Sequence, residues 1–127
     1  MKDRPDESTT TTVIDLEPQP DPRQVVGDPG FIHVEVVGGP MDGDRRRVSA
    51  NCFTIGRIET NDLPLPLDPR ISAKHARITR DGPQYWLEDL GSSNGTYLGQ
   101  LRVHERAAIG PGAIFVLGGT YLEFMAF

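Results

Sequence analysis

The chain has 127 residues, of which 37% are hydrophobic and 24% are charged, and its formal net charge at pH 7 is −5. That length accommodates one domain of ordinary size. No apolar run approaches the ~18 residues of a membrane-spanning helix, and the acidic balance argues against a polyanion-binding protein, so we expect neither a membrane nor nucleic acid as a partner.

The first 30 residues differ in composition from the rest of the chain. They hold six hydrophobic residues, five of the eleven prolines, and three basic against seven acidic side chains. Such a segment cannot bury enough apolar surface to offset the entropy of ordering it. We therefore expect a disordered acidic tail over residues 1–30 and a folded domain over residues 31–127.

Two features favour a cytoplasmic protein. The polar, acidic start of the chain lacks the apolar core of a secretory signal. The single cysteine, Cys52, cannot form an intramolecular disulfide, which fits a reducing compartment. We expect Cys52 to be buried as a small hydrophobic residue.

Short strand-like segments follow one another from Phe31 onwards. The first, FIHVEVV, places Ile32, Val34 and Val36 on one face, and GGPMDG then predicts a hairpin turn. The further segments are RRRVSA, CFTIGR, LPLPL, HARITR, QYWLEDL, TYL, LRV, AIFVLG and TYLEFMAF. Since no stretch of ten residues has a helical period, the pattern predicts an all-β protein, an antiparallel sandwich or barrel.

Three of these segments carry an expectation of their own. Pro64 and Pro66 confine LPLPL to an edge or an irregular stretch. The basic run 45–47, beside two aspartates, indicates a solvated edge strand rather than a nucleic-acid-binding patch. Trp86 lies within a predicted strand, and we expect it in the core.

Three polar, glycine-bearing segments lie at the ends of predicted strands, where a rigid β scaffold commonly displays recognition groups. They are GR at 56–57, RISAKH at 70–75 and GSSNGT at 91–96. In this order and at these spacings, the three segments resemble the forkhead-associated (FHA) domain. The resemblance covers residues 31–127.

The resemblance implies a β-sandwich of about eleven strands that binds phosphothreonine peptides, needs no cofactor and catalyses nothing. It assigns Arg57 and Ser72 to the phosphate, Ser93 to a place near the phosphate, and Asn94 to the backbone of the ligand. Lys74 can add a second positive charge. These residue types suit the ligand, because a phosphothreonine carries about −1.5 to −2 charges and three acceptor oxygens, which a planar guanidinium can grip in pairs.

The resemblance also assigns supporting roles around the ligand. Gly56, His75 and Gly95 shape and brace the binding loops. Arg70 lies where some family members read the third residue after the phosphothreonine, and an arginine there would favour an acidic residue. Ala73 departs from the family pattern of Arg or Asn after the serine, so one ligand contact is expected to be missing.

Other interpretations of the same residues are weaker. His75 lies near Ser72, but no acidic orienting partner occurs at motif spacing, which argues against catalysis. The three histidines are too scattered for a metal site, and GSSNGT lacks the lysine of a nucleotide-binding loop. The alternative function that remains is a phosphate-independent interaction module that binds through a sheet face.

The threonine run Thr9–Thr12 in the tail has two interpretations. It is either a low-complexity stretch with no role or the substrate of a Ser/Thr protein kinase. In the second case the chain is similar in organisation to small bacterial FHA regulators, whose phosphorylated N-terminal tail folds back onto their own domain. Both Thr11 and Thr12 are candidates, since Ile14 lies three residues after Thr11 and Asp15 three after Thr12. The partners are then the kinase, phosphothreonine-containing proteins and the chain's own tail.

Overall fold

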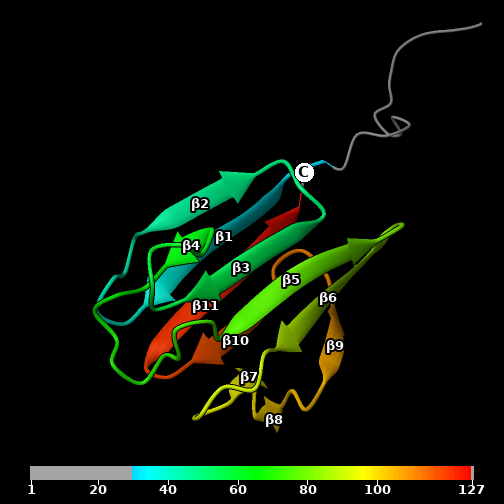
Figure 1. Cartoon of the computed structure of the whole chain (residues 1–127). Coiled ribbons are helices and arrows are strands. Elements are labelled where there is room, and N and C mark those ends of the chain that lie inside the picture. The colour runs from blue at the N-terminus through cyan, green and yellow to red at the C-terminus, as the bar shows by residue number, and fades with distance from the viewer. Residues whose placement is uncertain (1–29, 127) are drawn as a thin grey trace, which may run out of the picture.

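The computed structural model describes residues 30–126, which form eleven β-strands and no helix (Figure 1). This part of the chain thus holds no helix that could span a membrane. The expected tail lies outside the described residues, apart from Gly30. The strands are β1 (Ile32–Gly38), β2 (Arg45–Val48), β3 (Cys52–Gly56), β4 (Leu63–Pro64), β5 (Ala76–Asp81), β6 (Gln84–Asp89), β7 (Thr96–Leu98), β8 (Leu101–Arg102), β9 (Arg106–Ile109), β10 (Ile114–Leu117) and β11 (Thr120–Ala126).

The strands form two sheets that face each other as a sandwich (Figure 1). The six-stranded sheet has the order β2-β1-β11-β10-β7-β8, and the five-stranded sheet has the order β4-β3-β5-β6-β9. Neighbouring strands are antiparallel except β3 and β4, which pair in parallel. The predicted all-β sandwich is confirmed, and so is the edge position of the LPLPL segment.

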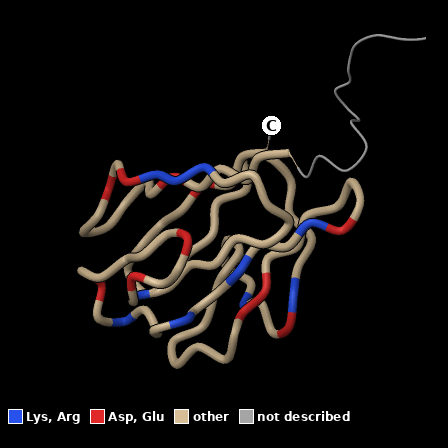
Figure 2. The backbone as a smooth tube through the Cα atoms, turned by 45° about the horizontal axis from the view of Figure 1, so that its top comes forward, with Lys and Arg blue, Asp and Glu red and all other residues tan. Residues whose placement is uncertain are grey.

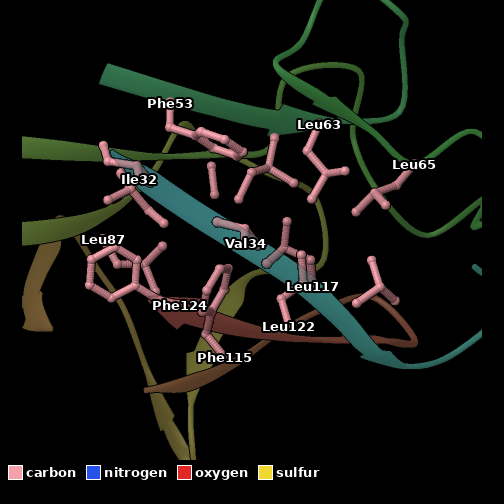
Figure 3. Close-up of a cluster of buried hydrophobic side chains, with 14 of the residues drawn as sticks. Ile32, Val34, Phe53, Leu63, Leu65, Leu87, Phe115, Leu117, Leu122 and Phe124 are labelled. Carbon is pink, nitrogen blue, oxygen red and sulfur yellow. The ribbon is translucent and has the colours of Figure 1, made fainter. Parts of the chain in front are cut away.

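Alternation along β1 shows how the sequence builds the core. Ile32, Val34 and Val36 are buried between the sheets, whereas His33 and Glu35 face outward and are half-buried. The same alternation in the other long strands fills the space between the sheets with large apolar side chains (Figure 3). Burial of this apolar surface is the main favourable term in folding. The labelled side chains from the other strands include Phe53, Leu87, Phe115, Leu117, Leu122 and Phe124.

The two ends of the sandwich carry different parts of the chain (Figure 1). At one end, Ala76 pairs with both Ile55 and Asp89, so β3 and β6 finish where β5 begins. At the other end, Ile32 pairs with Ala126, which places the start of β1 beside the finish of β11. The loops that follow β3 and β6 and the loop that precedes β5 therefore lie at the opposite end of the sandwich from Ile32 and Ala126.

The basic run on β2 lies at an edge of the six-stranded sheet, where Figure 2 shows it as a long blue stretch of the tube. Its three arginines are exposed. Arg45 lies opposite Glu35 on β1, and the Arg47 guanidinium lies 4.9 Å from the centroid of the Phe31 ring. The predicted solvated edge strand is confirmed.

Three details of the fold differ from the sequence-based expectation. The strand Arg106–Ile109 was not among the predicted segments, because two of its four residues are alanines, which have low β-propensity. Cys52 is exposed rather than buried, since it is an outward-facing residue of β3. Trp86 lies half-buried on the outer face of its sheet, while its neighbour Leu87 enters the core. The Arg106 guanidinium covers the Trp86 ring at 4.0 Å from the centroid.

Candidate functional site

Three loops surround a pocket of about 310 Å³ at the end of the sandwich opposite the Ile32–Ala126 pair. They connect β3 to β4, β4 to β5 and β6 to β7 (Figure 1). The pocket is lined by Arg57, Pro69, Arg70, Ile71, Ser72, Ala73, Ser93 and Asn94. Four of the five residues predicted to contact a ligand therefore lie around one pocket. A larger pocket of about 440 Å³ lies along β8 and β9 and contains none of them.

Lys74 is the predicted contact residue that does not line this pocket. Its Nζ lies 3.5 Å from the hydroxyl oxygen of Thr60, which is a long distance for a hydrogen bond. The side chain is exposed. Lys74 therefore contributes positive charge near the pocket without being fixed at its wall.

Arg57 follows β3 directly and is held by the segment that precedes β5. Its backbone N–H donates to the carbonyl oxygen of Ser72 at 3.0 Å, and its Nε donates to the carbonyl oxygen of Ile71 at 3.0 Å. The second bond orients the guanidinium, while its two Nη groups have no hydrogen-bond partner among residues 30–126. A planar fork of free donors suits a tetrahedral anion.

Gly56 allows the loop before β5 to come close to the end of β3. A Cβ at this position would collide with the carbonyl oxygen of Ala73 and would lie 2.8 Å from Nδ2 of Asn61. Asn61 is buried, and its Nδ2 donates to the carbonyl oxygens of Ile58 at 2.7 Å and Ala73 at 2.9 Å. Asn61 was not among the predicted site residues, because nothing in the neighbouring sequence indicates a contact with a residue twelve positions later.

His75 joins two of the three loops. Its ring is fully buried, Nδ1 accepts the backbone N–H of Ser72 at 3.1 Å, and Nε2 therefore carries the proton and donates to the carbonyl oxygen of Gly95 at 2.9 Å. Burial lowers the pKa of His75 below its ordinary value of 6.5, against the opposing effects of the Gly95 carbonyl and of the charges on Asp89 and Asp68. The neutral ring thus acts as a brace.

Two further hydrogen bonds connect the walls of the pocket. Oγ of Ser72 accepts the backbone N–H of Ser93 at 3.1 Å, and Nδ2 of Asn94 donates to the carbonyl oxygen of Arg70 at 2.8 Å. The turn that brings these groups into place passes through Gly95 at φ +87°, a conformation that other residues rarely adopt. Ser72, Ser93 and Asn94 consequently line one small pocket.

Asp89 organises the β6–β7 loop and was not among the predicted site residues. Its carboxylate accepts the backbone N–H groups of Gly91 and Ser92 and the hydroxyls of Ser92 and Thr96, at 2.6–3.1 Å. Burial alone would raise the pKa of Asp89, but these hydrogen bonds outweigh it and lower that pKa. The signal available in the sequence was an aspartate two residues before a glycine, which is typical of an Asx-turn.

The hydrogen bonds also decide what Ser72 and His75 can do chemically. Nδ1 of His75 is occupied by the backbone N–H of Ser72, and its Nε2 faces the Gly95 carbonyl, so neither nitrogen is placed to take a proton from the Ser72 hydroxyl. A nucleophile of the serine–histidine type needs that contact. Within residues 30–126 there is also no cluster of three or more His, Cys, Asp or Glu side chains that could hold a metal ion.

Comparison with known proteins identifies the fold and its loops. The sequence profile of the FHA domain matches residues 53–118, which include all three loops. The chain belongs to the FHA domain family. The solved FHA domain of an Arabidopsis thaliana protein superimposes on this domain with a TM-score of 0.69 and 30% identity, over 76% of this chain and 86% of that chain.

Two bacterial proteins are also similar to this chain in sequence. The FHA domain-containing protein FhaB of Mycobacterium tuberculosis is 34% identical over 91 residues, which are 72% of this chain and 58% of FhaB. The oxoglutarate dehydrogenase inhibitor of Corynebacterium jeikeium is 37% identical over 78 residues, which are 61% of this chain and 54% of that protein. This FHA chain therefore spans a little more than half the length of each of these two curated relatives.

Proposed function

We propose that the FHA domain binds phosphothreonine peptides in the pocket formed by Arg57, Ser72, Ser93 and Asn94. The observation that carries this proposal is the fixed Arg57 guanidinium, whose two Nη groups are free beside the pocket. Charge-assisted bonds from a guanidinium to phosphate are among the strongest hydrogen bonds in proteins. The Ser72 hydroxyl and the Asn94 amide add donors for the phosphate and for the ligand backbone.

In this proposal the protein is an adaptor rather than an enzyme. A Ser/Thr kinase attaches the phosphate, and the three loops read it in the cytoplasm, where the kinase has its ATP. One similar protein is named as an inhibitor of oxoglutarate dehydrogenase, which is a regulatory role. The protein partner of the present chain is then any protein that displays a suitable phosphothreonine.

The chain's own tail is one such ligand in this proposal, with Thr11 or Thr12 as the phosphorylated residue. The tail must cross the sandwich, because the domain begins at the end away from the pocket. The 18 residues from Thr12 to Gly30 can span up to about 60 Å, whereas a domain of this size has a radius of gyration of about 13 Å. A tethered ligand at an effective concentration of up to about millimolar would exclude outside peptides.

The test of peptide recognition is a titration of the unphosphorylated full-length protein with peptides copied from residues 6–18. One peptide carries threonine at position 11, and the other carries phosphothreonine there. We expect binding of the phosphothreonine peptide and none of the unmodified peptide. The Arg57→Ala variant should lose at least about 30-fold in affinity, since about 2 kcal/mol or more is lost when a charged partner of a phosphate is removed.

The control variant is Arg46→Ala, which removes an exposed arginine from the edge strand β2 without touching the pocket. It should bind like the wild type. If the wild type binds neither the phosphothreonine peptide of residues 6–18 nor a degenerate phosphothreonine peptide library, the proposal is wrong.

The alternative is a phosphate-independent module that binds through a sheet face. The observation in its favour is the outer face of the six-stranded sheet, where Tyr121 and Ile114 are 51% and 42% exposed. Binding of an unmodified partner by the Arg57→Ala variant as well as by the wild type would favour this second function.

A further inference from the structure

Arg70 differs from Arg57 in having a carboxylate beside it. Asp68 is buried, with 1% of its surface exposed, and its Oδ1 lies 3.8 Å from Nε of Arg70. The same oxygen accepts the backbone N–H of Arg70 at 3.0 Å. Arg57 has no carboxylate partner among residues 30–126. The pocket therefore has one uncompensated arginine and one paired arginine.

Asp68 is itself anchored to the turn between β10 and β11. Its Oδ2 accepts the backbone N–H of Gly119 and the hydroxyl of Thr120, each at 2.8 Å. These contacts join residues more than fifty positions apart in the sequence. The carboxylate is thus held in place by the β10–β11 turn of the sandwich, although Asp68 itself lies in a loop.

The β10–β11 turn also provides the surface on which Arg70 rests. A Cβ on Gly119 would collide with the Arg70 guanidinium, so the guanidinium lies directly over the backbone of this glycine. At Gly118, a Cβ would lie 3.0 Å from Cβ of Arg70 and 3.1 Å from Oδ2 of Asp68. Two consecutive glycines therefore leave room for the Asp68–Arg70 pair.

The carboxylate keeps its negative charge at neutral pH. Burial alone would raise the pKa of Asp68, but hydrogen bonds from Thr120, Arg70 and Gly119, together with the positive charge of Arg70, lower that pKa. An acidic side chain that approaches Arg70 thus meets an ion pair with little net charge. The attraction of a lone cation falls steeply when a fixed opposite charge lies a few ångströms away.

We propose that Asp68 is a positioning residue that holds Arg70 on the β10–β11 turn and offsets its charge, so that the third residue after the phosphothreonine is read without a preference for acidic side chains. This inference rests on the proposed function of the pocket. An apolar side chain at that position packs on Pro69 and on the methylene stem of Arg70, both of which line the pocket. Under this proposal Arg70 does not produce the acidic preference that the family resemblance implies.

The inference distinguishes the two candidate threonines of the tail. Ile14 follows Thr11 by three residues, and Asp15 follows Thr12 by three. Without a preference for an acidic residue, Asp15 gives Thr12 no advantage. A phosphorylated Thr11, with Ile14 packed on the stem of Arg70, is then the better ligand.

The experiment measures one ratio in several variants of the full-length, unphosphorylated protein. Two peptides copied from residues 6–18, both phosphorylated at Thr11, carry either the native Ile14 or the Ile14→Asp change. Isothermal titration calorimetry measures both affinities. The affinity for the aspartate peptide divided by the affinity for the isoleucine peptide is the acid-preference ratio. In the wild type we expect the two peptides to bind within about twofold of each other.

The Asp68→Asn variant keeps the shape of the side chain and removes its charge. We expect the ratio to rise to about five- to tenfold in favour of the aspartate peptide, and to shrink again when the salt is raised from 50 to 500 mM NaCl. The added Arg70→Gln change should return the ratio to the wild-type value. A purely structural role of Asp68 would weaken both peptides equally and leave the ratio unmoved.

The Arg70→Gln variant alone keeps the inference testable if Asp68→Asn fails to fold, because the Arg70 side chain is 67% exposed. We expect both peptides to weaken together and the ratio to stay within about twofold. A wild-type ratio above fivefold that Arg70→Gln abolishes would overturn the inference while leaving phosphothreonine recognition intact. Absence of binding by the wild type to any phosphothreonine peptide would instead reject the proposed function and this inference with it.

Discussion

At the scale of single residues, the position of Arg57 depends on the absence of a side chain at Gly56. The loop that supplies the acceptors for Arg57 passes so close to Gly56 that a single added carbon would meet the Ala73 carbonyl. Protein interiors are packed so densely that an extra methyl group at such a contact requires a shift of the backbone. The glycine is therefore required by the contact between a strand and a loop, and not by an unusual φ of its own.

The change Gly56→Ala should lower the free energy of unfolding by about 1–3 kcal/mol, because the collision forces the loop outward. Displacement of the acceptors of Arg57 should also weaken phosphopeptide binding. Urea denaturation followed by circular dichroism measures the first effect. The matched control is Gly110→Ala, where a Cβ would meet no atom within 4 Å, and stability should change by no more than about 0.5 kcal/mol. Equal stability of the two variants would contradict the prediction.

At the scale of loops and strands, His75 connects two loops through one buried neutral ring. A protonated ring would present an N–H to the backbone N–H of Ser72 and break that bond. Because its pKa is lowered in the folded state, the unfolded chain binds the proton more readily than the folded one. The stability that this ring contributes is complete above its ordinary pKa of 6.5 and is lost as the pH falls below that value.

We therefore expect the free energy of unfolding to decline between pH 7 and pH 5. Asp68, Glu88 and Asp89 also have lowered pKa values, but their contributions are lost mainly below the ordinary values of 3.8 for the aspartates and 4.5 for Glu88, so they add little to a decline between pH 7 and pH 5. Urea denaturation at half-unit steps of pH measures it. The decline should disappear in His75→Asn and persist in His104→Asn, which alters an exposed histidine. Persistence of the decline in both variants would place its cause elsewhere.

The strands were predictable from the sequence because each depends mainly on its own alternation of side chains. Periodicity identified ten segments and missed β9, whose alanines carry little signal. Alternation does not tell which face of a strand is buried, so Cys52 and Trp86 were placed wrongly. The pocket residues lie in loops with recognisable family motifs. Asp68 was missed because its partners on the β10–β11 turn are distant in sequence.

At the scale of the whole molecule, the tail and the pocket lie in one chain, so a kinase could switch the domain off. We expect that full-length protein phosphorylated stoichiometrically on the tail will no longer bind a phosphothreonine peptide supplied in trans. A tethered ligand near millimolar effective concentration outcompetes a free peptide of similar affinity at micromolar concentration. Fluorescence anisotropy with a labelled peptide measures the loss.

The control for the tail is a variant in which Thr11 and Thr12 are both changed to alanine before treatment with the kinase. This variant should bind the labelled peptide as the untreated protein does. Undiminished peptide binding after stoichiometric phosphorylation of the wild type would show that the tail does not occupy the pocket.

The pairing of β1 with β11 has a mechanical consequence. The strands are antiparallel neighbours, and their outer ends, Ile32 and Ala126, face each other at one end of the sandwich. A force that pulls the two ends of the domain apart acts across the strands and loads their hydrogen bonds one pair at a time, as in opening a zip. Strands loaded along their length would resist with all their bonds at once. Under tension the domain should therefore yield first at the Ile32–Ala126 pair, while the loops around the pocket, at the far end, stay folded longest.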